Sequence, residues 1–203
     1  MSSAPLSRPI RIGMYTLAGL LLAFEVGVLW LVLHPNVSED YRAYYITQTT
    51  TCLNQPVPGT YSFGTMVSFL PEGRDAAKSV RVCGWEGPAG DGTHAVGTSA
   101  RLRFAPAERP DAMTLTLEMI AITREGHPQQ RVAVRVGGTS VGDVVVPATG
   151  PVTVTLPIPD EVAARPGPVE VTLTFPDAIQ MGPTDPASRW RSIKLIAAGL
   201  VPA

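Results

Sequence analysis

The most apolar stretch of the chain runs from residue 12 to residue 33, and Glu25 is its single charged residue. A helix of this length spans about 33 Å, which matches the roughly 30 Å hydrocarbon core of a bilayer. A cleaved signal peptide is the competing interpretation, but its apolar region has only about 7–15 residues and ends in a small-x-small site. Residues 30–35 contain no such site. The pattern therefore favours an uncleaved transmembrane helix at residues 12–33.

The charges on the two sides of this stretch differ in sign. Arg8 and Arg11 precede it, and Glu39 and Asp40 follow it. Positive charge is retained on the cytoplasmic side of single-pass proteins. We therefore expect residues 1–11 in the cytoplasm of a bacterium, the helix among inner-membrane lipids, and the rest of the chain in the periplasm.

Two features of the predicted helix point to a membrane partner. Glu25 lies just past the middle of the span, where a carboxyl group costs a few kcal/mol unless it is neutralised or partnered. It is either a protonated side chain tolerated in a single helix or a contact to a polar or cationic group of another membrane protein. Gly19, Ala23 and Gly27 form a small-xxx-small pattern that lets a second helix approach closely. We expect the helix to dock beside a polytopic protein, using Glu25 and this face.

After residue 60 apolar and polar residues alternate, with Gly, Pro, Asp and Asn between the alternating segments. Residues 34–60 show no sustained period and are expected to form a linker, with one edge strand around 44–51. Alternation indicates strands that bury one face and expose the other. We therefore expect an all-β domain over residues 61–203, an antiparallel β-sandwich of the jelly-roll type. About nine strands are predicted, at 65–69, 79–83, 101–104, 113–119, 131–136, 141–146, 152–156, 169–175 and 193–195.

The only two cysteines, Cys52 and Cys83, both fall on the expected periplasmic side. In an oxidising compartment such a pair commonly forms a disulfide. The loop closed would be about 30 residues long, and its closure is worth about 3–4 kcal/mol by chain entropy. The alternative is two buried thiols too far apart to bond.

Composition narrows the classes of function. Lys and Arg number 16 against 17 Asp and Glu, and charged residues make up 16% of the chain, below the roughly 25% of ordinary domains. A nucleic-acid-binding basic face is therefore not expected. The chain has only three histidines, His34, His94 and His127, and none has metal-ligand spacing. No nucleophile or phosphate-loop motif is present either, so we expect no enzymatic activity, cofactor or metal.

Two segments carry candidate contact residues. In the glycine-rich segment 84–100, Trp85 could form a flat apolar platform for a sugar ring, with Glu86, Asp91 and His94 as hydrogen-bonding groups. The alternative is that Trp85 plugs one end of the sandwich core.

The second segment, residues 182–191, precedes the last predicted strand. Asp185 is expected to cap a turn and to pair with Arg189 or Arg191, and Trp190 is either a core residue or a second platform. We include Asp185, Arg189 and Trp190 among the candidate glycan contacts.

Short motifs in these segments and between them resemble those of a known class of domains. They read Gly-Trp-Glu-Gly-Pro at 84–88, Gly-Thr-Ser-Ala-Arg-Leu-Arg-Phe at 97–104, His-Pro-Gln-Gln-Arg-Val at 127–132 and Asp-Pro-Ala-Ser-Arg-Trp-Arg-Ser-Ile at 185–193. The chain is similar here to the non-catalytic β-sandwich ancillary domains of bacterial membrane glycosyltransferases and exopolysaccharide assembly. In that class the last turn carries Leu-Gly where this chain has Trp190 and Arg191.

The resemblance implies a non-enzymatic, single-pass accessory subunit of an inner-membrane polysaccharide synthase or export complex. Its sandwich would lie near the glycan exit and contact the glycan. The alternative is a purely structural subunit of another membrane complex, energy-transducing or secretory, without glycan contact.

Overall fold

The computed structural model describes residues 8–34, 36–37, 41–46, 52, 57, 59–108, 110, 112–182 and 190–203. The chain forms two compact units, Met1–Glu39 and Asp40–Ala203.

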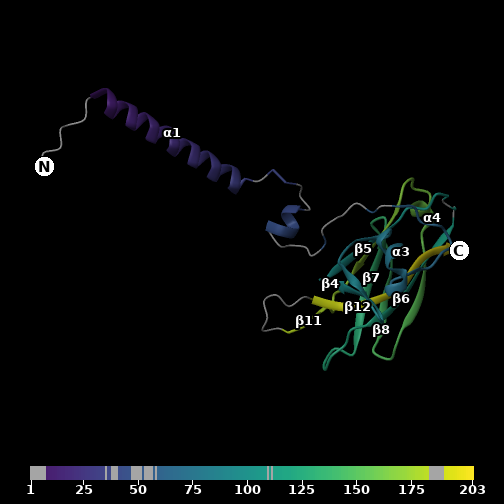
Figure 1. The fold of residues 1–203 in the computed structure, drawn as a ribbon. Coiled ribbons are helices and arrows are strands. Elements are labelled where there is room, and N and C mark those ends of the chain that lie inside the picture. Colours follow the sequence, from purple (N-terminus) through teal and green to yellow (C-terminus); the bar gives the residue numbers. More distant parts are fainter. Residues whose placement is uncertain are drawn as a thin grey trace. The chain divides into compact units, whose positions relative to one another are not determined.

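The first unit is built around one continuous helix, α1 (Arg8–Leu33) (Figure 1). Its 26 residues give a length of about 39 Å at 1.5 Å per residue. The helix is long and apolar enough to cross a membrane, and none of its side chains is buried within the protein. At its end the Trp30 ring stacks on His34, with the ring centroids 4.9 Å apart.

The second unit is a β-sandwich of two antiparallel sheets, as predicted (Figure 1). The seven-stranded sheet has the order β3-β4-β12-β6-β9, and β1 and β11 also pair with β12. Its strands are β1 (Val67–Ser68), β3 (Trp85–Ala89), β4 (Gly92–Val96), β6 (Met113–Ala121), β9 (Val152–Pro157), β11 (Ile179–Gln180) and β12 (Trp190–Pro202).

The five-stranded sheet has the order β2-β5-β10-β7-β8. Its strands are β2 (Arg81–Cys83), β5 (Ser99–Phe104), β7 (Gln129–Val136), β8 (Thr139–Pro147) and β10 (Val169–Thr174). One short helical element, η1 (Arg42–Ile46), precedes the first strand, and three others lie between strands: η2 (Pro71–Gly73), α3 (Arg74–Lys78) and α4 (Asp160–Ala163).

The alternation seen in the sequence produces the core. Leu115, Leu117 and Met119 of β6 are fully buried, and so are Leu102 of β5 and Leu173 of β10. The residues between them face outward and are partly exposed. Burial of large apolar side chains at about 1.5–3 kcal/mol each is the main force that holds the two sheets together.

The hydroxyl group of Tyr61 adds a buried polar anchor. It accepts a hydrogen bond from the Leu200 N–H at 2.8 Å and donates to the Thr65 carbonyl oxygen at 2.5 Å. The ring packs edge-on against Phe104. Burial of the ring raises the pKa of this phenol above its usual value. The segment before β1 is thereby fixed to β12.

Most of the glycine-rich segment 84–100, for which no strand was predicted before residue 101, is a β-hairpin made of β3 and β4. Gly84 enters it with φ +78°, a left-handed conformation that favours glycine. A Cβ atom here would also overlap the Ser99 carbonyl oxygen. The alternation rule missed the hairpin because its strands carry few apolar residues.

The edge strand expected around 44–51 is wrong in its described part, because Arg42–Ile46 forms a single helical turn. The predicted disulfide is confirmed. Cys52 bonds Cys83 of β2 with their Cα atoms 4.8 Å apart, and both half-cystines form a small buried cluster with Val82.

Candidate functional site

The β3–β4 hairpin of the first segment lies beside Trp190 and Arg191, the described residues at the end of the second segment, in the seven-stranded sheet. In the register of β4 and β12, Lys194 lies opposite His94 and Arg191 lies opposite Val96. The Gly97 N–H donates to the Trp190 carbonyl oxygen at 3.0 Å. The β3–β4 hairpin and the start of β12 therefore form one continuous surface.

Two ion pairs connect β12 to the hairpin. Arg191 Nη2 lies 2.6 Å from Glu86 Oε1, and Lys194 Nζ pairs with Asp91 in the hairpin turn. Together with His94 these four residues form what we call the polar clamp. The Lys194 pair lowers the pKa of Asp91, mainly through the hydrogen bond from the ammonium group. The clamp locks three strand segments in one register.

His94 is half-buried between the two ion pairs. Burial lowers the pKa of its imidazole, and the positive charges of Lys194 and Arg191 lower it further. The ring is therefore neutral at neutral pH. His94 Nδ1 and Arg191 Nη1 are buried and have no hydrogen-bond partner among the described residues. A ligand cannot reach these two atoms without local movement, so the clamp is foremost a rigid support.

Trp85 packs against the core rather than serving as a platform. Its ring lies 6.1 Å from that of Phe69, and its Nε1–H donates to the Arg101 carbonyl oxygen at 2.9 Å. One face and the polar edge of the indole are thus in use within the protein. The structure favours the alternative in which Trp85 closes the core.

Trp190 is placed differently, because its side chain is 43% exposed. It lies directly opposite Gln180 of β11, and exposed Met181 follows Gln180 in the chain. Arg124 Nη1 donates to the Gln180 carbonyl oxygen at 3.3 Å. We call Trp190, Gln180, Met181 and Arg124 the Trp190 surface. Strand alternation puts the Trp190 side chain on the opposite side of β12 from Arg191.

The sequence did not point to Gln180, Met181 or Arg124 as members of this surface. They join Trp190 through β11, which has only two residues and no alternation to reveal it. Asp185 and Arg189, the other candidate contacts, lie outside the described residues.

The helix α1 separates the two features expected to contact a membrane partner. At 100° per residue, Glu25 lies about 160° from the middle of the stripe formed by Gly19, Ala23 and Gly27. The two features therefore do not form one face, and a contact of either with a membrane partner stays a prediction. The continuous helix presents the carboxyl group and the small residues on nearly opposite sides.

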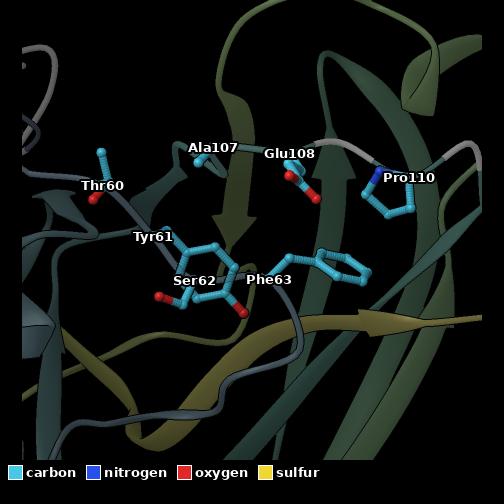
Figure 2. A pocket seen from close by; sticks show the side chains of 7 residues that line it. All are labelled: Thr60, Tyr61, Ser62, Phe63, Ala107, Glu108 and Pro110. Carbon is cyan, nitrogen blue, oxygen red and sulfur yellow. The ribbon is translucent and has the colours of Figure 1, made fainter.

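A cleft of about 500 Å³ opens between residues 60–63 on one side and residues 107, 108 and 110 on the other (Figure 2). The Tyr61 ring forms part of its wall, but its hydroxyl group is committed to Leu200 and Thr65. Residues 109 and 111 lie outside the described residues, so we assign the cleft no role. Its lining consists of Thr60, Tyr61, Ser62, Phe63, Ala107, Glu108 and Pro110. In the described part of the chain no group of three or more His, Cys, Asp or Glu side chains could hold a metal ion.

Comparisons with known proteins give distant structural matches only. No protein-family model matches the sequence, and no curated protein does. One structural match is CsCBM6-3 from Clostridium stercorarium in complex with cellobiose, with TM-score 0.41 and 15% identity over 72% of this chain and 100% of that chain. A β-1,3-glucan binding CBM6 from Bacillus halodurans matches with TM-score 0.35 and 19% identity over 68% and 99% of the two chains.

A third match is a glycoside hydrolase family 43 arabinoxylan arabinofuranohydrolase from Bacillus subtilis in complex with cellotetraose. It has TM-score 0.41 and 12% identity over 72% of this chain, which spans only 28% of the enzyme's chain. At these values no function is transferred, and the description of the sandwich rests on the strand pairing given above.

Proposed function

We propose that this protein is a non-enzymatic, single-pass accessory subunit of a bacterial inner-membrane polysaccharide synthase or export complex. Its helix α1 crosses the membrane, and its sandwich contacts the emerging glycan in the periplasm. The Trp190 surface is the contact, and a polytopic glycosyltransferase is the membrane partner.

The exposure of Trp190 on a rigidly held strand is the observation that carries this proposal. An exposed indole offers a flat apolar face for a sugar ring, and nearby amide and guanidinium groups offer hydrogen bonds to hydroxyls. Gln180 and Arg124 supply these groups. The polar clamp holds the first residues of β12 against the hairpin, so the ring is presented at little entropic cost.

The anchor is supported by the length and hydropathy of α1, and the periplasmic location is supported by the disulfide between Cys52 and Cys83. The opposite positions of Glu25 and the Gly19 stripe support two separate helix contacts. An anchor wedged between two helices of a polytopic protein would use both.

Glycan binding by the full-length protein in phosphatidylcholine nanodiscs tests the contact. Trp190→Ala is expected to weaken binding to the host's envelope glycan at least tenfold, whereas Trp190→Tyr retains most of it because a ring remains. Met66→Ala is the matched control, since Met66 is 39% exposed elsewhere on the sandwich. Equal binding by the wild type and Trp190→Ala, or no binding at all, would favour the purely structural subunit.

Co-purification from the native host in mild detergent tests the partner. We expect a polytopic protein to elute with the wild type, and both Glu25→Leu and Ala23→Leu to reduce its yield. Phe24→Ala is the control within the same helix, because Phe24 lies 100° from both Glu25 and Ala23. A wild-type chain that elutes alone and monodisperse would contradict the proposal.

A further inference from the structure

The outer face of the five-stranded sheet carries a row of three polar residues in one register. Thr172 of β10 pairs with Arg101 of β5 on one side and with Arg135 of β7 on the other. The residues before and after each of the three are fully buried, so their own side chains point outward. The row Arg101–Thr172–Arg135 therefore crosses the middle of this face.

The two arginines of the row lack an acidic partner among the described residues. Their arginine neighbours are paired: Arg103 Nε lies 2.7 Å from Glu170 Oε1, and Arg131 binds Asp177 through two side-chain nitrogens. Arg135 Nε donates only to the Gly138 carbonyl oxygen at 3.1 Å.

One further carboxylate lies on the face. Asp143 is opposite Ala133 on β8, and its field acts on Arg131, whose pKa it helps to raise. The middle row thus keeps its positive charge, while the charges beside it are compensated.

The spacing of the row suits an anion. Neighbouring strands lie about 4.8 Å apart, so the Cα atoms of Arg101 and Arg135 are about 10 Å apart. Two long side chains on such a base can converge above the Thr172 hydroxyl group. Guanidinium groups bind carboxylates through paired N–H donors, which gives direction as well as charge.

We propose that this row binds the carboxylate groups of an acidic polysaccharide. A lipid surface fits less well, because Val145 is the one exposed large apolar residue among the described residues of this face and offers little to insert into a bilayer. The choice of a glycan as the source of the carboxylates rests on the proposed function. The row lies on the other sheet from the Trp190 surface, so the two contacts can be tested separately.

The experiment uses the full-length protein in phosphatidylcholine nanodiscs and two matched probes. Oligogalacturonate carries one carboxylate per sugar, and its fully methyl-esterified form keeps the same chain without the charges. We expect the wild type to bind the acidic probe at least tenfold more tightly, and this preference to shrink as the salt concentration rises.

Substitutions of Arg101 and Arg135 test whether the row causes the preference for the acidic probe. Arg101→Gln with Arg135→Gln is expected to abolish it, and Arg101→Lys with Arg135→Lys to retain part of it, because charge remains but the paired donors are lost. The control Arg74→Gln with Lys78→Gln removes two exposed positive charges from α3 and should leave the preference intact. Each variant should have the same unfolding midpoint as the wild type, which excludes misfolding as the cause of a binding change.

Equal binding of the two probes by the wild type would overturn the inference. So would a loss of the preference for the acidic probe in the α3 control that equals the loss in the Arg101→Gln, Arg135→Gln variant. It would also fail if the glutamine variant lost affinity for phosphatidylglycerol vesicles but not for oligogalacturonate. Trp190→Ala separates the two proposals, because it should weaken both probes alike. If the arginine variants changed binding of the acidic probe and Trp190→Ala did not weaken either probe, the proposal for the row would stand and that for the Trp190 surface would fail.

Discussion

Arg191 reaches from the start of β12 across β4 to Glu86 on β3, with 2.6 Å between Nη2 and Oε1. The side chain of Arg191 is 16% exposed and that of Glu86 is 31% exposed. A single ion pair thus spans three strands, two of which are far apart in the sequence.

Loss of the Glu86 carboxylate is expected to destabilise the sandwich. Glu86→Gln leaves the mostly buried guanidinium of Arg191 without its charged partner, and we expect a loss of about 1–3 kcal/mol in unfolding free energy. Denaturant unfolding of the full-length protein in detergent measures it. The control is Asp75→Asn, because the Asp75–Lys78 pair is exposed and should contribute under about 1 kcal/mol. Equal effects of both variants would contradict the expectation.

Acidification is expected to weaken the polar clamp through His94. The folded-state pKa of His94 is lowered by burial and by Lys194 and Arg191, so the unfolded chain takes up the proton first. The stability is fully present above the unfolded pKa of about 6.5 and is lost as the pH falls through the lower folded pKa. Unfolding midpoints between pH 7.5 and 5 should fall less in His94→Gln than in the wild type. If the unfolding midpoints of the wild type and His94→Gln fell in parallel with pH, His94 would not be the group through which acid weakens the clamp.

Tyr61→Phe is expected to cost about 1–3 kcal/mol. The substitution keeps the ring but leaves the buried Leu200 N–H without its acceptor. Thermal unfolding provides the measurement, with Ser140→Ala on exposed β8 as a control for the loss of a hydroxyl group. A Tyr61→Phe protein as stable as the wild type would show that water replaces the phenol.

Reduction of the disulfide is expected to lower stability by about 3–4 kcal/mol, because the bond closes a loop of about 30 residues in the unfolded chain. Cys52→Ser with Cys83→Ser should reproduce the loss and should not respond to dithiothreitol. Unfolding with and without reductant checks both. A wild-type protein indifferent to reductant would contradict the expectation.

The strands with strict alternation were predictable, and those in mixed segments were not. Leu115, Leu117 and Met119 identify β6 because every second residue is apolar. The β3–β4 hairpin escapes this rule, since Thr93 occupies a buried position and donates to the Phe69 carbonyl oxygen at 2.7 Å. Gln130 and Ser192 are likewise buried polar residues bonded to each other, a pairing that no local pattern reveals.

The sequence pointed to some residues of the candidate site but not to their geometry. The sequence marked Glu86, Asp91 and His94, but their charged partners on β12 follow only from long-range strand pairing. It treated Trp85 and Trp190 as equivalent, and only packing against Phe69 separates the core residue from the exposed one. The row Arg101–Thr172–Arg135 could not be predicted from the sequence, because its residues come together only when three strands distant in sequence pair in the observed register.

The position of β12 has a consequence for the order of folding during synthesis. All five strands of one sheet lie between Arg81 and Thr174, so that sheet can pair before the last residues are made. The other sheet is centred on β12, the last strand to be synthesised, which alone joins β4 to β6 and also pairs with β1 and β11. Its partners must wait with unpaired edges, which are prone to aggregate. A chaperone that shields these edges until β12 has been made would therefore raise the yield of folded protein.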